Sequence, residues 1–264
     1  KTSRSLGVSA KGIVKINNGW QIDTTSGAFT AATVVDTRPP QRIPTYGQFF
    51  LGREIKTERP IFDPNVVHLM SFRKARSTGV DFVYILPFAA DQALIEVTSF
   101  APKNPGHQVF TEWLNTEINA LDAGQIEIVR TEAGALPMEA GFTDPVPDGI
   151  IRMGLGAGGA RPSTGYAFSR IQEQADHIAD ALVHGSDPNV VLDGKITHFL
   201  DRVFLQVLTS NPAQGPALFE KLFRNAPRDR LERFLSGSTR ATDRFSVMAS
   251  LPPRPFMQAA MFPK

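Results

Sequence analysis

The 264-residue sequence contains no cysteine, which excludes disulfide frameworks, thiolate nucleophiles and cysteine-ligated zinc sites. It also lacks a strong charge of one sign, because 28 basic and 26 acidic residues leave a net charge of +2. This composition does not favour a nucleic-acid partner. No apolar run approaches the roughly 20 residues of a membrane-spanning helix, and no secretory signal peptide is visible. We therefore expect a cytoplasmic protein that at most attaches peripherally to a membrane.

Metal-binding patterns are also missing. The five histidines do not form a His-Glu-x-x-His pair, and His177 and His184 lie two turns apart on one predicted helix, where a structural role is the simpler interpretation. The sequence therefore predicts no metal site.

The first part of the chain has the signals of short antiparallel strands. Turn chemistry at Asn17–Gly19 and Thr25–Gly27 predicts a three-stranded meander over residues 8–35, with the third strand running to Val35 before the pair Pro39 and Pro40. Longer strands are expected next, at 46–57, 66–72, 80–88, 93–100 and 125–131. The strands at 80–88 and 93–100 should pair as a hairpin, and a periodic apolar pattern predicts a helix over 107–122.

From Gly149 onward the pattern becomes helical. A short strand at 150–153 and a glycine-rich stretch lead into a helix over 166–183, which Gly185 ends. Further helices are expected at 195–209, 216–224, 228–236, 240–250 and 254–261. Arginines between Arg224 and Arg254 alternate with large apolar residues. That pattern fits either a membrane-surface face or an ordinary solvated helix face.

The glycine-rich stretch matches a dinucleotide motif only superficially. Gly154, Gly156 and Gly159 satisfy G-x-G-x-x-G, but Pro162 interrupts the stretch and no second parallel strand follows the helix. We therefore reject a Rossmann interpretation. Two alternatives stay open: a loop whose N–H groups bind an electron-rich group at a helix N-terminus, or a tight turn that lets strand and helix pack closely.

Glu96 is the best candidate for chemistry. It lies in the predicted strand 93–100 and shares a face with Leu94, Thr98 and Phe100. A carboxyl held against apolar side chains can stay protonated near neutral pH and act as a proton donor. The alternative is a glutamate at a strand edge that points into water.

Six motifs together resemble the lycopene cyclase family of flavoproteins. They occur in a consistent order over nearly the whole chain: Leu86–Phe88, Leu94–Thr98, Leu136–Met138, Arg161–Tyr166, Arg170–Gln172 and Leu251–Phe256. The segment Leu94–Thr98 is similar to the family's signature with a catalytic acid, and the resemblance places that acid at Glu96.

The sequence departs from the family pattern in three places. Val97 stands where a second acidic residue is usual, and Ser71 stands where an aspartate is common. The N-terminal βαβ dinucleotide fingerprint of these flavoproteins is not found in the chain. We therefore expect a cyclase without its N-terminal third, which by itself binds FAD weakly or not at all.

The resemblance implies a mixed α+β and α/β fold. Residues 1–40 and 149–185 would be the remainder of an FAD-binding domain of the GR2 flavoprotein type. Residues 41–148 would form an antiparallel substrate-binding sheet, and residues 186–264 a helical cap that would face a membrane.

The resemblance also implies the activity: redox-neutral, acid-catalysed cyclisation of the linear ends of lycopene to β-rings, with reduced FAD and NAD(P)H as its reductant. Glu96 would be the catalytic acid, and Phe82, Tyr84 and Phe100 would line the substrate pocket or belong to the plain core. Seven loop residues would contact the flavin, with backbone N–H groups as donors: Gly156, Gly158, Gly159, Pro162, Ser163, Thr164 and Gly165.

Two other function classes fit the same sequence. A polyprenyl reductase or an aromatic monooxygenase would share the loop and the sheet without needing an acid at Glu96. A non-catalytic module that binds carotenoids or membranes would need neither flavin nor acid.

Overall fold

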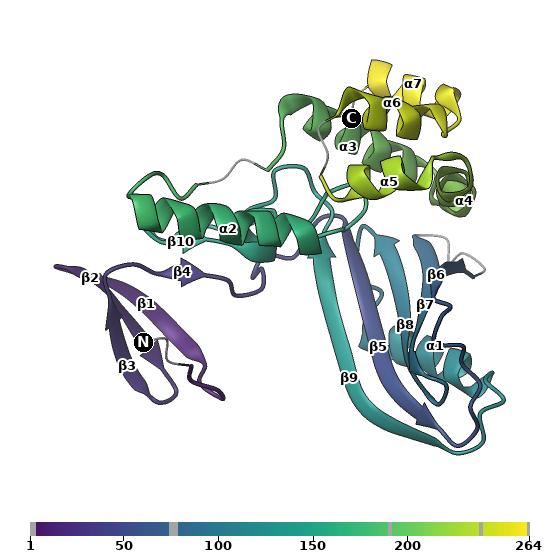
Figure 1. The fold of residues 1–264 in the computed structure, drawn as a ribbon, viewed down its shortest axis with the longest axis horizontal. Helices are drawn as coiled ribbons and strands as arrows, with labels where there is room; N and C mark the ends of the chain where they lie inside the picture. Colours follow the sequence, from purple (N-terminus) through teal and green to yellow (C-terminus); the bar gives the residue numbers. More distant parts are fainter. Residues whose placement is uncertain (1–3, 74–78, 190–191, 238–239, 263–264) are drawn as a thin grey trace.

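Three sheets and a group of C-terminal helices make up the described part of the chain (Figure 1). The structure is a computed structural model, and it describes residues 4–73, 79–189, 192–237 and 240–262. A small N-terminal sheet stands apart from a large tilted sheet, and the helix α2 (Phe168–His184) runs between them. The remaining C-terminal helices gather above one end of the large sheet.

The N-terminal sheet is the predicted meander. It consists of β1 (Ala10–Ile16), β2 (Gly19–Thr24) and β3 (Gly27–Ala31), joined antiparallel in chain order. Gly19 and Gly27 have positive φ angles of 139° and 112°, conformations that favour glycine, so the turn signals in the sequence identified the right positions.

The prediction that the third strand continues to Val35 is wrong. β3 ends at Ala31, and a separate strand β4 (Val35–Asp36) pairs in parallel with β10 (Ile151–Arg152), more than a hundred residues later. A sequence window cannot show such a change of partner, because parallel pairing joins segments that are distant in the chain.

The large sheet is antiparallel, with the order β6-β7-β8-β5-β9. Its strands lie close to the predicted ranges: β5 (Gly47–Thr57), β6 (His68–Phe72), β7 (Val80–Ala89), β8 (Gln92–Ala101) and β9 (Ile126–Pro137). The expected hairpin of β7 and β8 is confirmed. β9 continues beyond the predicted residue 131 because it pairs with β5 along the whole of that long strand.

The two faces of this sheet pack against different helices. On one face, α1 (His107–Asn119) buries Phe110 and Leu114 against odd-numbered residues of the central strands, such as Val97. On the other face, α3 (Lys195–Ser210) and α4 (Gly215–Asn225) pack on even-numbered residues. The alternation of side chains along each strand therefore decides which helix a residue meets.

The C-terminal region follows the expected helical pattern. After α3 and α4 come α5 (Arg228–Leu235), α6 (Ala241–Ala249) and α7 (Pro253–Met261). We call α3–α7 the cap. No helix within the described ranges combines the length and the apolar character that crossing a bilayer requires.

Candidate functional site

The residues around Glu96 form one row across the large sheet. In the register of the strands, Glu96 on β8 lies opposite Tyr84 on β7 and Gly52 on β5, and Gly52 in turn lies opposite Glu132 on β9. Directly opposed residues share a face. Glu96 therefore lies beside Tyr84, on the face that also carries Phe82.

Glu96 is partly buried, and the pKa of its carboxyl is strongly raised. Burial raises the pKa of its carboxyl to about 7, the hydroxyl of Thr98 lowers that pKa by donating a hydrogen bond to Oε1 at 2.8 Å, and the charge of Glu132 raises it. Near neutral pH a large fraction of Glu96 is thus protonated.

This raised pKa makes folding stability depend on pH. The folded-state pKa of Glu96, about 7, lies above its ordinary value of 4.5, so the folded state binds the proton more tightly. Compared with a Glu96→Gln variant, the wild type should be most stable below pH 4.5 and lose up to about 3 kcal/mol as the pH rises through 7. Urea unfolding of both proteins between pH 4 and 8 measures this. Two parallel curves would contradict the assigned environment of Glu96.

The three aromatic residues proposed for the pocket lie in different surroundings. Phe82 and Phe100 are fully buried, with ring centroids 4.9 Å apart, and Phe100 lies 5.9 Å from Phe219 of the cap. Tyr84 is only partly buried, and its ring lies 5.2 Å from that of Phe82. The rings therefore form a connected series from the neighbour of Glu96 into the core beneath the cap, and Tyr84 is the member that lies directly beside the carboxyl.

Local packing explains the glycines of the loop that follows β10. Gly158 has a φ of 72° and ends a short 3-10 turn. A Cβ atom at Gly159 would lie 2.7 Å from the carbonyl oxygen of Gly154 and 2.9 Å from a side-chain carbon of Ile171, and one at Gly156 would collide with the guanidinium of Arg152. These contacts support the tight-turn alternative, in which the glycines let α2 approach the loop.

Several backbone N–H groups of the loop already form hydrogen bonds within the loop. The N–H groups of Gly158, Gly159, Thr164 and Gly165 donate to carbonyl oxygens within the loop. A pocket of about 210 Å³ nevertheless borders it, lined in part by Gly158 and Pro162. Gly158 and Pro162 can therefore form one wall of a ligand site. Four of the loop N–H groups that were expected to bind the ligand already have partners within the loop.

The loop lies on the same side of the sheet as Glu96. Gly165 approaches the side-chain oxygen of Gln48 on β5, and Gln48 lies opposite Phe100, on the even-numbered face of β8. From Phe100 to Glu96 is four residues along the strand, about 13 Å. The loop and the carboxyl of Glu96 therefore lie on the same face of the large sheet.

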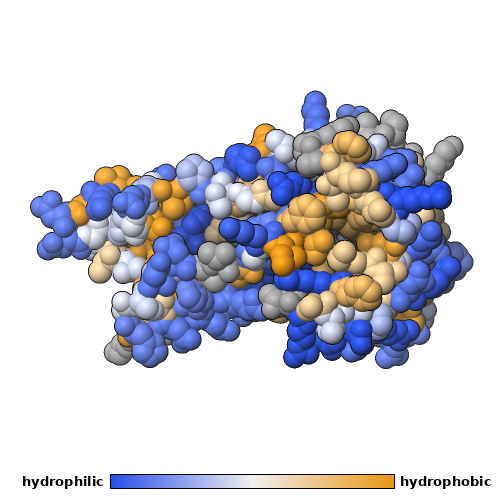
Figure 2. All heavy atoms as spheres, turned by 90° about the horizontal axis from the view of Figure 1, so that it is seen from above, coloured by the Kyte–Doolittle hydropathy of each residue, from blue (hydrophilic) through white to orange (hydrophobic). Residues whose placement is uncertain are grey.

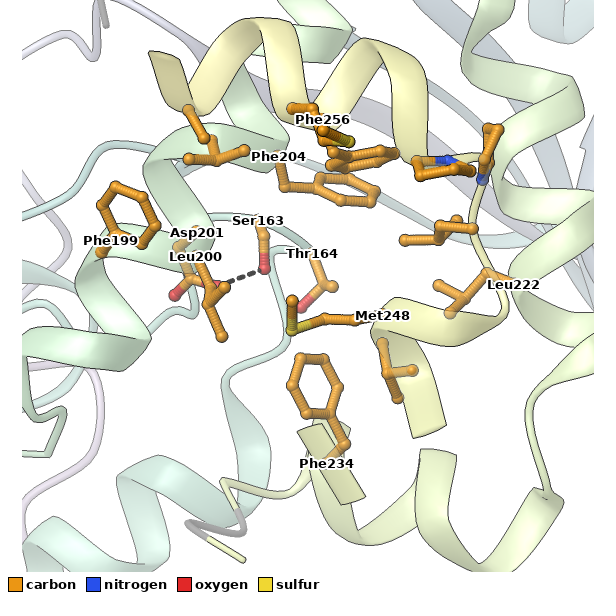
Figure 3. Close-up of a pocket in the computed structure, with 17 residues that line it drawn as sticks. Ser163, Thr164, Phe199, Leu200, Asp201, Phe204, Leu222, Phe234, Met248 and Phe256 are labelled. Atoms are coloured by element: carbon orange, nitrogen blue, oxygen red, sulfur yellow. Dashed lines mark hydrogen bonds between the residues drawn. The ribbon is translucent and has the colours of Figure 1, made fainter. Parts of the chain in front are cut away.

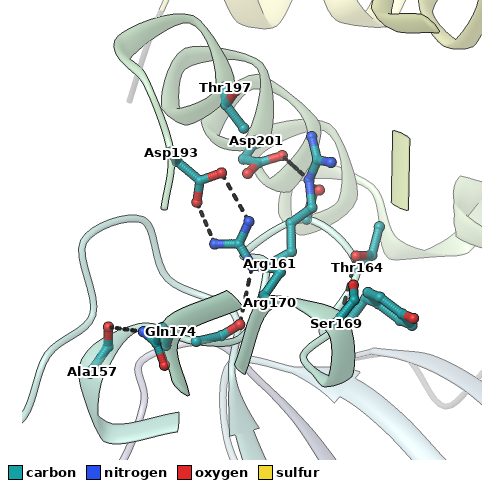
Figure 4. A network of polar contacts seen from close by, with 12 residues as sticks. Ala157, Arg161, Thr164, Ser169, Arg170, Gln174, Asp193, Thr197 and Asp201 are labelled. Atoms are coloured by element: carbon teal, nitrogen blue, oxygen red, sulfur yellow. Dashed lines mark hydrogen bonds and ion pairs between the residues drawn. The ribbon is translucent and has the colours of Figure 1, made fainter. Parts of the chain in front are cut away.

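Two buried ion pairs anchor this loop (Figure 4). Arg161 contacts Asp201 on α3, which also accepts a hydrogen bond from Ser163 at 2.7 Å. Arg170 on α2 binds both carboxylate oxygens of Asp193 and donates to the carbonyl oxygen of Gly159 at 3.1 Å. Sequence reasoning included both arginines in the family motifs but gave them no role, because their acidic partners lie 40 and 23 positions away.

A cavity of about 260 Å³ lies between this loop and the cap (Figure 3). Ser163 and Thr164 line one side of it, and almost all the rest of its wall is apolar, including Phe204 and Phe256. Phe204 is 5.7 Å from Phe219, so the cavity wall continues the series of rings that begins at Tyr84. The sequence did not predict this cavity, because its walls come from α3, α4, α5, α6, α7 and the loop.

The cavity reaches the surface among exposed apolar side chains. Phe199, Met248 and Met257 line it and are also 41%, 54% and 58% exposed. Seen from above, apolar residues gather over the cap (Figure 2). We call the exposed apolar side chains of the cap and of the residue that follows it the apolar patch, which besides these three includes Ile196, Phe245, Met261 and Phe262.

Several arginines of the cap have partners within the cap. Arg233 on α5 pairs with the fully buried Asp243 on α6, and Arg244 donates to Thr197 on α3. These contacts join helices. The exposed apolar residues named above define the patch.

The two positions where a residue differs from the family motifs, Val97 and Ser71, lie on the face opposite Glu96. Val97 is fully buried in the core under α1, and Ser71 on β6 lies opposite Val83, which belongs to the same core. Neither position faces the carboxyl of Glu96. Among the described residues, no group of three or more histidine, aspartate or glutamate side chains is arranged to hold a metal ion.

Comparison with known proteins decides the family. The model of the family described as lycopene cyclase protein matches residues 10–261, almost the whole chain. The chain belongs to the lycopene cyclase family. The predicted family is thereby confirmed on the residues from which it was inferred.

The curated relatives of this lycopene cyclase family member are distant. The lycopene beta-cyclase of Pseudescherichia vulneris is 28% identical over 88% of the chain and 64% of the relative, and that of a Paracoccus species is 29% identical over 85% and 62%. The chloroplastic lycopene beta cyclase of Nicotiana tabacum is 27% identical over 72% of the chain and 41% of the relative. The chain thus spans less than two thirds of each relative.

Solved structures confirm the fold class. A geranylgeranyl bacteriochlorophyll reductase-like protein from Thermoplasma acidophilum matches with a TM-score of 0.55 and 12% identity, over 96% of this chain and 68% of the other. The flavin-dependent brominase Bmp2, as a triple mutant, matches with a TM-score of 0.52 and 15% identity, over 92% and 69%. The lycopene cyclase family member therefore has the mixed α/β fold of flavin-dependent enzymes.

Proposed function

We propose that this chain carries the acid side of a lycopene cyclase active site and that the full-length protein closes the linear ends of lycopene into β-rings. The observation that carries the proposal is the environment of Glu96. This carboxyl is partly buried, has a pKa of about 7 and lies beside Tyr84, in a chain whose family is that of the lycopene cyclases. An acid that is protonated near neutral pH is what proton transfer to an alkene requires.

In the proposed reaction, protonated Glu96 donates its proton to the terminal double bond of the substrate. A carbon–hydrogen bond forms, and the resulting tertiary cation is attacked by the neighbouring alkene to close the ring. Loss of one ring proton restores a double bond, so the substrate gains and loses one proton and is neither oxidised nor reduced. In this proposal the ring of Tyr84, which lies opposite Glu96, stabilises the cation, an effect of roughly 0.5–2 kcal/mol for an aromatic face.

The loop residues proposed to hold FAD are Gly156, Gly158, Gly159, Pro162, Ser163, Thr164 and Gly165. The pocket that borders Gly158 and Pro162, and the orientation of the loop toward the side of Glu96, support this assignment. The chemistry that reduced FAD, maintained by NAD(P)H, would supply when bound is stabilisation of positive charge without net electron transfer. Arg161 and Arg170 keep the loop in place through their buried partners.

The apolar patch of the cap supports a peripheral contact with a membrane. A carotene dissolves in the bilayer, so the enzyme has to reach hydrocarbon from the surface. The cavity behind the loop opens at Phe199, Met248 and Met257 within this patch, which gives an apolar ligand a continuous apolar surface to enter by. In this proposal residues 186–264 act as the membrane-facing cap, residues 1–40 and 149–185 belong to the flavin domain, and residues 41–148 form the substrate sheet.

We expect a Phe245→Ser, Met257→Ser double variant to bind lipid vesicles at least tenfold more weakly than the wild type, because two large exposed apolar side chains are lost. Vesicle flotation measures the bound fraction. Val183→Ser is the matched control, since Val183 is an exposed apolar residue on α2, outside the patch. Equal binding of all three proteins would argue against the patch as the contact surface.

Pigment analysis of lycopene-accumulating cells that express the full-length protein tests the proposed function. Formation of β-rings that depends on Glu96 is the expected result. Unchanged lycopene would contradict it.

A further inference from the structure

A gap in the sheet brings a second carboxylate close to Glu96. Neighbouring strands lie about 4.8 Å apart, so Glu96 on β8 and Glu132 on β9, with β5 between them, would ordinarily be too distant for their side chains to influence one another strongly. The residue between them is Gly52, which has no side chain. The row therefore contains a bare backbone position with an acidic residue on each side.

Atoms of Leu94, Glu132 and Glu96 surround this position, and the nearest is the Cδ1 of Leu94, 3.1 Å from a Cβ atom built on Gly52. A Cβ atom built on Gly52 would lie 3.4 Å from the Cβ of Glu96 and 3.2 Å from the Cγ of Glu132. Since both atoms lie within 3.4 Å of the same point, they are at most twice that distance apart. Any larger residue at position 52 would fill the space through which the two side chains approach each other.

A basic residue lies beside Glu132 and forms an ion pair with it. Arg130 forms ion pairs with Glu132 and, at 2.6 Å, with Glu54. Glu54 lies next to Gly52 on the same face of β5 and also accepts a hydrogen bond from Gln92. Two carboxylates and one guanidinium leave this cluster with a net charge of −1 beside Glu96.

We propose that Glu132 is a positioning residue for Glu96: placed against it across Gly52, it keeps Glu96 in the protonated form that donates. Two like charges in one site disfavour ionisation of the less solvated member. Glu96 is that member, because Glu132 is 33% exposed and ion-paired whereas Glu96 has only the hydroxyl of Thr98 as its hydrogen-bond partner in the described contacts.

Burial is the largest cause of the raised pKa of Glu96, and among the charged groups around it Glu132 acts in the same direction. On β7 the facing residue is Tyr84, whose pKa is raised by burial and, secondly, by the charge of Glu96, so it stays neutral. On β8 itself the neighbour is Thr98. On β5 and β9 the charged groups are Glu54, Arg130 and Glu132, and the negative charge of Glu132 contributes to the raised pKa of Glu96.

The inference rests on the proposed function, since the proton of Glu96 matters only if Glu96 donates it. It also explains why the acid chemistry does not require an acidic residue at Val97, which lies on the opposite face. The second carboxylate reaches Glu96 from a different strand.

The experiment titrates the carboxyl of Glu96 directly. In the protein labelled with ¹³C at the glutamate side-chain carboxyls, the resonance of Glu96 is the one missing from Glu96→Gln, and its shift is followed from pH 4 to 9. Glu132→Gln should lower the titration midpoint by at least about half a pH unit, which reduces the protonated fraction of Glu96 roughly threefold above its pKa. Glu132→Asp keeps the charge but has a shorter side chain, so it should lower the titration midpoint of Glu96 by less than Glu132→Gln does. It replaces Glu132→Gln in the experiment if that variant does not fold.

Glu127→Gln is the matched control, because Glu127 is exposed on the same strand, opposite Lys56. It should leave the midpoint of Glu96 unchanged. An unchanged midpoint in Glu132→Gln, or an equal shift in Glu127→Gln, would overturn the proposal. The titration needs no turnover, so it can be judged separately from activity. If Glu132→Gln shifts the midpoint but Glu96→Gln still forms rings, only the cyclase mechanism is rejected. If Glu132→Gln does not shift the midpoint but Glu96→Gln no longer forms rings, only the role of Glu132 is rejected.

Discussion

Glu96→Gln is expected to abolish ring formation. Glutamine keeps the size and the hydrogen-bonding ability of the side chain but has no proton to give at neutral pH, and loss of a general acid typically lowers a rate by 10²- to 10⁴-fold. Lycopene-accumulating cells that express the full-length variant should retain lycopene, as measured by chromatography of extracted pigments. Because Glu96 is partly buried and its charged form is disfavoured, the variant should fold at least as well as the wild type at pH 7.

The same substitution separates the function classes that the sequence left open. A flavin-dependent reductase or monooxygenase with this fold has no need of an acid at this position and should tolerate the change. Glu127→Gln controls for loss of a negative charge on the sheet, since Glu127 is exposed and lies outside the row of Glu96. Cyclase activity that survives in Glu96→Gln would disprove the proposed role of this residue.

Arg170→Ala is expected to cause the largest loss of stability. Arg170 is 1% exposed, binds both oxygens of the buried Asp193 and donates to Gly159 of the loop. Removal of one partner leaves an uncompensated buried carboxylate, which costs about 3–5 kcal/mol. Thermal unfolding followed by circular dichroism should show a melting temperature lower by roughly 10 °C.

The control for this prediction is Arg224→Ala. Arg224 forms an ion pair with Glu220 one turn away on α4, but the two side chains are 73% and 59% exposed, so the pair contributes little. Its removal should leave the melting temperature nearly unchanged. Equal effects of the two substitutions would show that burial of the Arg170 pair has been misjudged.

The structure also shows what the arginines of the family motifs contact. The motifs Arg161–Tyr166 and Arg170–Gln172 each supply an arginine to a buried ion pair. Arg161 binds Asp201 on α3, and Arg170 binds Asp193 in the segment that precedes α3. Arg161 additionally lies 4.0 Å above the ring of Phe234, which ties the loop to α5. The motifs therefore preserve the position of the loop relative to the cap, and with it the cavity between them.

Local patterns in the sequence determined most of the secondary structure. Alternating apolar residues identified the strands of the large sheet, the helical period identified α1–α7, and turn chemistry identified the meander. The family, too, was readable from the sequence, because its motifs are short and contiguous. Glu96 was found in the same way: a lone carboxylate in an apolar strand is a local signal, and the pKa of about 7 agrees with the environment that the strand pattern implied.

Tertiary structure alone decided which residues meet. The parallel pairing of β4 with β10, the partners of Arg161 and Arg170, the walls of the cavity and the approach of Glu132 to Glu96 all join segments separated by tens of residues. Strand register is the physical reason in the last case: a shift of one residue between β5 and its neighbours would turn Gly52 to the other face and replace the gap with a side chain. The sequence therefore specifies the candidate acid, and the packing of the sheet specifies what lies beside it.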